Sequence, residues 1–180
     1  MPSRPGLSIA WIAGPLTYLI LEAVAAAAFP HYSYAHNLIS DLGIPEASPR
    51  SAVMNIAFCI QGTLFLVGAL FLSRARLFLT FATENAFGNI LIAIFHSGVP
   101  LHAVGAVLAI VGGNAAILAG SRVGGPFYWK VSIALGLFGL VSFVVFALVR
   151  TGVWERCSVY SILTWQLLIA VGVLWSRLDR

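Results

Sequence analysis

The chain has 180 residues, of which 60% are hydrophobic and only 9% are charged, and its mean hydropathy is +0.96. A soluble domain carries about a quarter charged residues, so this composition excludes a water-soluble globular protein and predicts an integral membrane protein. The ten basic residues behind the net charge of +4 form no run or patch, which excludes a nucleic-acid-binding surface. The length is that of one domain, and we expect residues 1–180 to form it.

Six apolar stretches are long enough, or nearly so, to cross a bilayer as helices, which takes about 20 residues. They run roughly over Leu7–Phe29, Ala52–Leu72, Leu77–Phe95, His102–Ala119, Val131–Val149 and Val159–Trp175. The segments between them are mostly short, so consecutive helices should pack antiparallel. The predicted fold is therefore an all-α bundle of six transmembrane helices.

The first stretch has two interpretations. Arg4 precedes it and small residues follow near its end, as in a secretory signal peptide. However, its apolar run is longer than that of a usual signal peptide, and it contains Glu22. We therefore favour a retained transmembrane helix.

Lysine and arginine predict the orientation, because they are enriched on the cytoplasmic side. If the N-terminus is cytoplasmic, the inner side holds seven of the ten basic residues: Arg4, Arg74, Arg76, Arg122, Lys130, Arg177 and Arg180. The outer side then holds Arg50, Arg150 and Arg156. This distribution predicts that both termini are cytoplasmic, in a prokaryotic cytoplasmic membrane.

All four histidines and three of the six acidic side chains then fall at the outer end. The residues at this end are His31, His36, Asp41 and Glu46 in the first outer segment, His96 and His102 around the next turn, and Arg150, Glu155 and Arg156 beside Tyr160 in the last. Glu22 lies about two turns inside the first helix, where a charge costs on the order of 2–3 kcal/mol or more. Arg150 and Arg156 are its candidate partners by depth. A neutral Glu22 bonded to a neighbouring helix is the alternative.

The first outer segment allows three interpretations. The spacings of His31, His36 and Asp41, and of His96 and His102, do not align two metal ligands on one helical face. No metal site is therefore predicted, and zinc is kept only as an alternative. Ser40, His36 and Asp41 could form a hydrolytic set, but near neighbours in one short loop rarely reach that geometry. We favour a re-entrant or capping loop in which Asp41 and Ser40 bond to backbone amides.

Other polar and small residues have structural explanations. Uncharged residues inside the spans, such as Gln61, Asn85, Asn89 and Asn114, should form hydrogen bonds between helices. Several glycines should let helices approach closely, although those inside the predicted spans form no strict GxxxG pattern. Cys59 and Cys157 fit no metal-ligand spacing. A disulfide between them is an alternative to two free thiols.

Three stretches follow one another between about His36 and Trp165: "HNLISDLGIPEASP", "PLHAVGAVLAIVGGNAAILAG" and "GVWERCSVYSILTW". Their order and spacing resemble the prokaryotic membrane-protein family known as domain of unknown function 998. The resemblance implies an S-D-L-G loop, an H-x-x-G-A helix start and a G-x-x-E-R motif, here Ser40–Gly43, His102 with Gly105 and Ala106, and Gly152 with Glu155 and Arg156. The family usually has a Phe-Pro pair before the helix-opening histidine, whereas here Pro100 is displaced from Phe95. The resemblance supports six helices and supplies no reaction.

Two functions are compatible with the polar residues at the outer end. In the first, they bind or process a lipid head group or lipid-linked substrate. His102 would be a general acid or base, with Asp41 and Glu155 as further catalytic residues, and the ligand-binding residues would be Arg156, Arg150, His36, Glu22 and Tyr160. In the second, they form a structural latch in a non-catalytic accessory or scaffold protein with a membrane-protein partner. Transport is a weaker alternative, because no pair of interrupted helices marks a midplane site. Membrane lipids are the expected partners, and no cofactor is predicted.

Overall fold

The computed structural model describes residues 5–123 and 125–178, and the regular structure of these residues is helical. The elements are α1 (Pro5–Ala28), η1 (Ser40–Gly43), α2 (Ser51–Leu72), α3 (Arg76–Ile94), α4 (Pro100–Ala119), η2 (Ser121–Val123), α5 (Pro126–Val149) and α6 (Gly152–Leu178). The six α-helices each contain a segment long and apolar enough to cross a membrane. For the described residues, the predicted six-helix membrane fold is confirmed.

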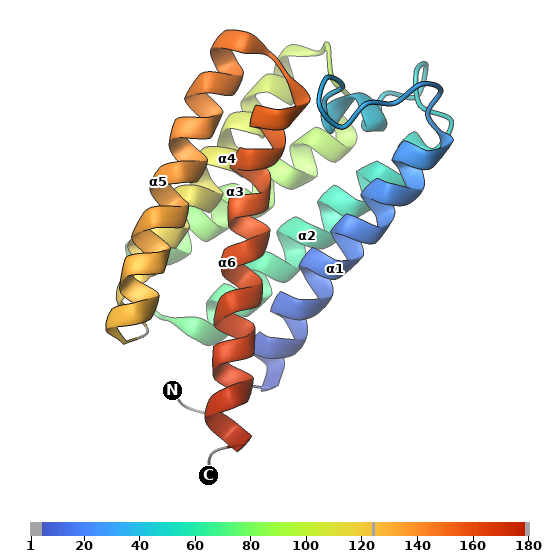
Figure 1. The fold of residues 1–180 in the computed structure, drawn as a ribbon. Helices are drawn as coiled ribbons and strands as arrows, with labels where there is room; N and C mark the ends of the chain where they lie inside the picture. Colours follow the sequence, from blue (N-terminus) through green and yellow to red (C-terminus); the bar gives the residue numbers. More distant parts are fainter. Residues whose placement is uncertain (1–4, 124, 179–180) are drawn as a thin grey trace.

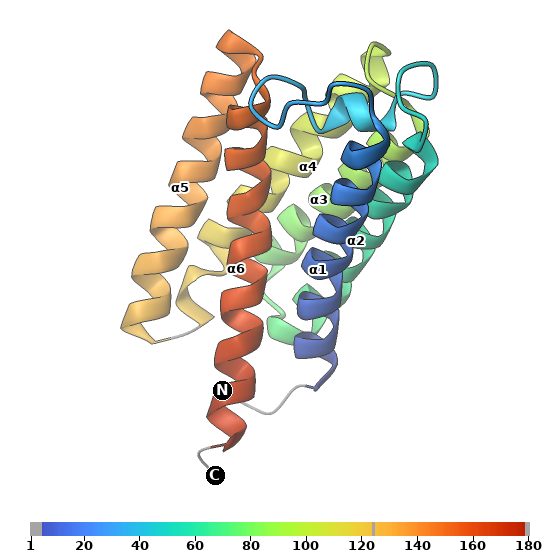
Figure 2. The same ribbon diagram turned by 45° about the vertical axis from the view of Figure 1, so that its right-hand side comes forward.

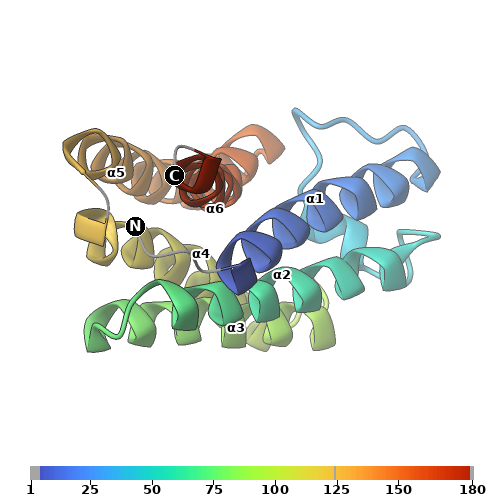
Figure 3. The ribbon, with the colours of Figure 1, turned by 90° about the horizontal axis from the view of Figure 1, so that it is seen from below.

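The six α-helices form a ring in chain order. Each packs against the next, α6 returns to pack against α1, and α4 also contacts α6. Because α1 begins and α6 ends at the same end of the bundle, we call this the terminal end (Figures 1 and 2). The opposite, loop end carries residues 29–50, 95–99 and 150–151. Seen along the bundle from the terminal end, α5 and α6 lie on one side of the ring and α2 and α3 on the other (Figure 3).

Two apolar cores fill the ring, one in each half of the bundle. The core of the terminal half is aromatic: the rings of Trp11 and Trp165 lie 5.0 Å apart, and Trp11 stacks on Phe65 at 5.7 Å. Both indole N–H groups have acceptors, the carbonyl oxygen of Phe65 at 2.9 Å and the hydroxyl of Ser132 at 2.8 Å. A second core, around Tyr18, occupies the loop-end half. Large aromatic rings, packed among aliphatic side chains, therefore form the centre of the core in the terminal half.

The outside of the bundle is as apolar as its inside. Large apolar side chains such as Ile9, Ile20, Val141 and Leu148 are exposed on the helices. In water, this much exposed apolar surface would drive association. In a bilayer it faces lipid tails, so no penalty arises. The exposed faces therefore agree with the membrane location that the composition predicts.

The last two helices begin earlier than the sequence predicts. The predicted span from Val159 is part of a helix that begins at Gly152, and α5 begins at Pro126 rather than Val131. The prediction was wrong at the start of α6 because hydropathy treats charged residues as loop residues. Glu155 and Arg156 instead lie in the first turns of α6, where protein groups surround them.

Candidate functional site

The 29–50 segment covers the start of α6 and bonds to it. The backbone amide of Gly152 donates to the carbonyl oxygen of His36 at 3.3 Å. This amide is one of those that have no partner inside the helix. A side chain at position 152 would collide with the backbone oxygen of Asn37, so only glycine fits there. This contact gives a physical reason for Gly152, the glycine of the G-x-x-E-R stretch that the family resemblance pointed to.

Glu155 holds the same segment from one turn further along α6. Its carboxylate accepts hydrogen bonds from the backbone amides of Ile39 and, at 3.3 Å, of Ser40. These amides lie at the start of η1, where a helix leaves N–H groups without internal partners. Glu155 is only 7% exposed. Among the described residues, no arginine or lysine forms an ion pair with it.

Arg156 is the centre of a second set of contacts. It forms a buried ion pair with Glu22, in which Nη2 lies 3.1 Å and Nε 3.2 Å from Oε1. Its Nη1 donates to the carbonyl oxygens of Tyr34 at 2.8 Å, Asn37 at 2.9 Å and Gly152 at 3.2 Å. Arg156 is 6% exposed and Glu22 is 1% exposed. The pair therefore ties α1, the 29–50 segment and α6 together.

Two tyrosine hydroxyls complete this set, and we call Glu22, Tyr32, Arg156 and Tyr160 the arginine cluster. The Tyr32 hydroxyl accepts from Nη2 of Arg156 and donates to the carbonyl oxygen of Leu38 at 2.9 Å. Burial raises the pKa of the Tyr32 phenol above its ordinary value, so the hydroxyl keeps the proton that it donates. Tyr160 donates to Oε2 of Glu22 at 2.9 Å. Each guanidinium nitrogen thus has a protein acceptor.

Replacing Tyr160 with phenylalanine removes the hydrogen bond to Glu22 and keeps the ring. We expect the free energy of unfolding to fall by about 1.5–3 kcal/mol, the usual contribution of a hydrogen bond to a charged group. Denaturant titration in detergent micelles, followed by tryptophan fluorescence, measures the change. Tyr34→Phe is the matched control, because Tyr34 contacts Arg156 through its backbone oxygen and ring, which phenylalanine retains. Equal losses from the two substitutions would contradict this account of Tyr160.

The proposed hydrolytic residues are not joined to one another. Asp41 accepts a hydrogen bond from the backbone amide of Leu38 at 2.8 Å, as the capping-loop interpretation predicts. Ser40 contributes its backbone amide to Glu155, and the side chain of His36 is exposed. No hydrogen bond links the side chains of Ser40, His36 and Asp41 in the described part of the chain. This geometry gives no support to a hydrolytic set.

The described residues also contain no group of three or more His, Cys, Asp and Glu side chains that could hold a metal ion. The zinc alternative thus finds no set of ligands there. Cys59 and Cys157 are both free thiols. The alternative of a disulfide between them is therefore wrong for this structure.

A groove of about 410 Å³ lies at the loop end between α4 and α5, beside the start of α6. Its polar lining comes from residues near the helix ends: Ser40, Ser97, His102, Arg150 and Glu155. Its apolar lining includes Val107, Ile110, Phe143 and Phe146. At 1.5 Å per helical residue, Phe146 and Phe143 lie roughly 6 and 10 Å deeper along α5 than Arg150. The groove is therefore polar at the end of the bundle and apolar toward its middle.

Arg150 is the cation of this groove, and it has an unusual backbone conformation. Its φ of 52° and ψ of 49° place it in the left-handed region, which few residues other than glycine adopt. It ends α5, and Thr151 alone separates it from α6. The Arg150 side chain is exposed, and its guanidinium has no ion-pair partner among the described residues. It is therefore available to an anion.

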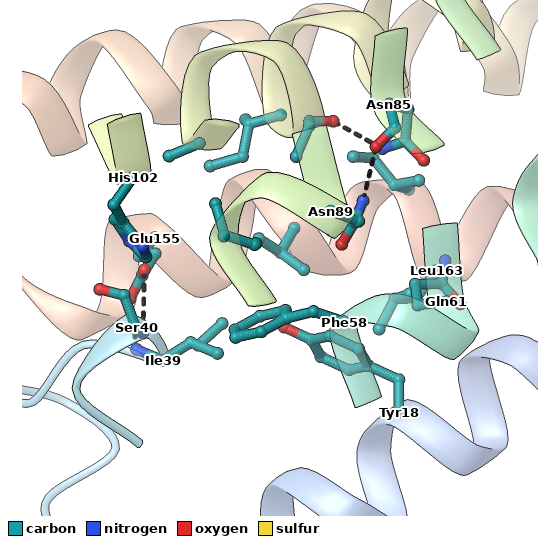
Figure 4. A pocket seen from close by; sticks show the side chains of 16 residues that line it. Tyr18, Ile39, Ser40, Phe58, Gln61, Asn85, Asn89, His102, Glu155 and Leu163 are labelled. Carbon is teal, nitrogen blue, oxygen red and sulfur yellow. Dashed lines mark hydrogen bonds between the residues drawn. The ribbon is translucent and has the colours of Figure 1, made fainter. Parts of the chain in front are cut away.

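A buried cavity of about 40 Å³ lies next to the groove. Ser40, Ala106, His102, Ile110 and Glu155 line both spaces and form their common wall. Figure 4 shows His102, Glu155 and Ser40 at one end of the cavity, with the two asparagines of α3, Asn85 and Asn89, at the other. The cavity thus extends from the groove wall toward amide side chains inside the bundle.

His102 is fixed in one tautomer when neutral. Its Nδ1 lies 2.7 Å from the carbonyl oxygen of Phe95, at the end of α3. A carbonyl oxygen can only accept, so Nδ1 carries the proton and Nε2 of the neutral ring is an acceptor. His102 is the third residue of α4 and is buried in the groove wall. Its ring is therefore anchored on one nitrogen and able to take a proton on the other.

The residues proposed from the sequence thus divide into groups. The groove is lined by His102, Arg150 and Glu155. Glu22, Arg156 and Tyr160 belong to the arginine cluster, of which Arg156 and Tyr160 also border a depression of about 510 Å³ between α5 and α6. Asp41 and His36 line neither the groove nor the buried cavity. Sequence reasoning did not assign the cavity residues to a site; they are Tyr18, Phe58, Gln61, Asn85 and Asn89. The one feature of the sequence that could have indicated them is the presence of polar residues inside apolar spans.

Comparison with known proteins gives one match. The model of the family described as "Protein of unknown function (DUF998)" matches residues 12–172. No curated protein and no solved structure matches the chain. The matched range includes the arginine cluster and both walls of the groove.

Proposed function

Because the chain belongs to the DUF998 family, a polytopic membrane family whose description assigns no activity, we propose a function from the groove itself. The protein binds the phosphate-bearing head group of a membrane lipid, or of a lipid-linked substrate, at the loop end. The observation that carries this proposal is the lining of the groove. An unpaired arginine lies at the bundle end, and aromatic and aliphatic side chains lie deeper.

This lining matches the two parts of a lipid. A phosphate at the membrane surface would meet Arg150, whose planar guanidinium suits phosphate oxygens. The first part of an acyl chain would lie against Phe143, Phe146 and Val107. The strained backbone of Arg150 also supports the proposal, because such conformations gather at functional sites. The distribution of lysine and arginine predicts that the loop end faces outward, so the lipid belongs to the outer leaflet.

The arginine cluster acts as the structural latch that the sequence suggested as its second possible function. The guanidinium of Arg156 already has acceptors on all three nitrogens, which leaves it little capacity for a ligand. We therefore assign anion binding to Arg150 and loop fixation to Arg156. His102 and Glu155, which lie in the groove wall, are the groups that could move a proton at a bound head group. Asp41 is outside the groove, so we rest the proposal on binding rather than catalysis.

Replacing Arg150 with glutamine should reduce retention of anionic phospholipid by about tenfold, because a charge-assisted hydrogen bond contributes about 1.5–3 kcal/mol. Native mass spectrometry of the full chain, extracted gently and titrated with phosphatidylglycerol, measures retention. Arg74→Gln is the matched control, an exposed arginine between α2 and α3 at the terminal end. Equal retention by the two variants would overturn the proposal.

A further inference from the structure

The groove contains one positive and one negative side chain that do not neutralise each other. Arg150 and Glu155 both line it, and they form no ion pair. The ion pair of the described chain is Arg156 with Glu22. A buried carboxylate without an ion-pair partner is costly. Two backbone amides and the Ser40 hydroxyl bond to Glu155, and a carboxylate can accept about four hydrogen bonds. Glu155 is therefore available to a cationic donor that enters from the groove.

The cavity beyond Glu155, like Glu155 itself, offers hydrogen-bond acceptors to a ligand that carries N–H donors. Oδ1 of Asn85 and Oε1 of Gln61 have no hydrogen-bond partner, and the two residues are 2% and 3% exposed. Asn85 uses its amide nitrogen to hold the carbonyl oxygen of Ala109 at 2.6 Å, so its free atom is the oxygen. Gln61 donates to Gln166, and the unpaired amide nitrogen of this pair belongs to Gln166, which does not line the cavity.

The size and remaining walls of the cavity restrict what can enter. The cavity volume of about 40 Å³ holds roughly three waters, or a small polar group with fewer waters. The rings of Tyr18 and Phe58, 6.0 Å apart, form an aromatic part of the wall. Aromatic faces attract cations. A carboxylate, unpaired amide oxygens and aromatic rings together favour a small ammonium group over an anion or an apolar chain.

We infer that the ligand is a zwitterionic aminophospholipid whose phosphate meets Arg150 and whose primary ammonium meets Glu155, with water filling the cavity behind it. This inference rests on the proposed function and names the class of head group. A primary ammonium carries three N–H donors on a compact charge. A trimethylated ammonium carries none and is larger. The site should therefore distinguish phosphatidylethanolamine from phosphatidylcholine, which have the same phosphate and differ in the amine.

The first test uses the wild-type chain, so it does not depend on whether a variant folds. Native mass spectrometry compares phosphatidylethanolamine with its monomethyl, dimethyl and trimethyl forms and with phosphatidylglycerol, all with the same acyl chains. We expect affinity to fall stepwise with methylation, by at least tenfold to phosphatidylcholine, and phosphatidylglycerol to bind more weakly than phosphatidylethanolamine. If all five lipids bind alike, the ammonium assignment is overturned and the proposed function stands. If none binds, both are overturned.

The second test separates the charge of Glu155 from its role in holding the 29–50 segment. Glu155→Gln keeps an amide oxygen as acceptor for one of the two backbone amides, that of Ile39 or that of Ser40, and removes the negative charge. The ratio of phosphatidylethanolamine to phosphatidylcholine affinity should fall close to one, whereas Arg150→Gln should weaken both lipids equally. Glu46→Gln, an exposed carboxylate in the same segment, is the control and should keep the ratio. An unchanged ratio in Glu155→Gln would overturn the inference.

A soluble competitor separates a lipid from a free ligand of the same chemistry. Glycerophosphoethanolamine has the same phosphodiester and ammonium charges and no acyl chain, so it cannot use the apolar part of the groove. We expect it to displace the lipid at least a hundredfold less well than a short-chain phosphatidylethanolamine does. Equal displacement would assign the site to a soluble amine phosphate and overturn the lipid assignment.

Discussion

Replacing Arg156 with methionine is expected to lower the free energy of unfolding by about 3–5 kcal/mol, the usual loss when one partner of a buried ion pair is removed. Methionine keeps much of the side-chain length, but it leaves the 1% exposed Glu22 without its cation. The carbonyl oxygens of Tyr34 and Asn37 also lose their donor, so the 29–50 segment should loosen from α6. Titration of the detergent-solubilised protein into sodium dodecyl sulfate, followed by circular dichroism, measures the loss.

A second substitution tests the cause. In the Arg156→Met background, Glu22→Gln replaces a buried charge with a neutral amide that costs less to bury. The double variant should therefore be about 1–3 kcal/mol more stable than Arg156→Met alone. Arg150→Met, an exposed arginine at the same end, should stay within about 0.5 kcal/mol of the wild type. A double variant no more stable than the single one would show that the ion pair is not the reason for the loss.

The membrane spans were predictable because apolar length is a local property of the sequence. The predicted span Ala52–Leu72 differs from α2 by one residue, because Ser51 begins the helix. The start of α6 was not predictable in this way. Hydropathy places Glu155 and Arg156 outside the membrane helix, whereas α6 includes both because the 29–50 segment and α1 supply their partners. Those partners are distant in sequence, so no local pattern reports them.

The candidate site was predictable only as a set of residues at one end. Depth along the helices made both Arg150 and Arg156 candidate partners of Glu22, and it could not choose between them. The packing of α6 against α1 decides between them: Arg156 forms the ion pair with Glu22, whereas Arg150 ends α5 beside the groove. The amides Gln61 and Asn85 were expected to form hydrogen bonds between helices, and each does so through its nitrogen. Their unpaired oxygens follow from packing that leaves a cavity, which composition does not encode.

The two halves of the bundle differ in a way that bears on function. Trp11, Phe65, Phe78 and Trp165 belong to one continuous core that fills the terminal half. The groove and the cavity share a wall and lie in the loop-end half. A passage across the membrane would have to displace the aromatic core. This arrangement favours binding from one face over transport, the weakest of the functions considered from the sequence.

The wall of the cavity on the α3 and α4 side depends on how closely these two helices approach. A Cβ atom on Gly88 would lie 2.6 Å from the carbonyl oxygen of Gly105 and 2.8 Å from Cα of Ala109. These are backbone atoms, which cannot rotate away. Gly88 is a lone glycine in α3, so no GxxxG spacing marks it in the sequence. Its importance follows from the contact with α4.

Replacing Gly88 with alanine should therefore lower the free energy of unfolding by about 3 kcal/mol or more, at the upper end of overpacking losses. The direction of the change in stability is informative, because glycine to alanine at an unobstructed helix position raises the free energy of unfolding by roughly 1 kcal/mol. Folded yield and the sodium dodecyl sulfate midpoint measure the effect. Gly125→Ala is the control for a glycine without close neighbours: a Cβ there meets nothing within 4 Å, and as the N-cap of α5 it should lose no more than about 1 kcal/mol. If Gly88→Ala were as stable as the wild type, α3 and α4 would lie further apart than described. The bond from Asn85 to Ala109, which joins these helices and leaves the Asn85 oxygen as the unpaired atom of a cavity residue, would then fail as a basis for the ammonium site.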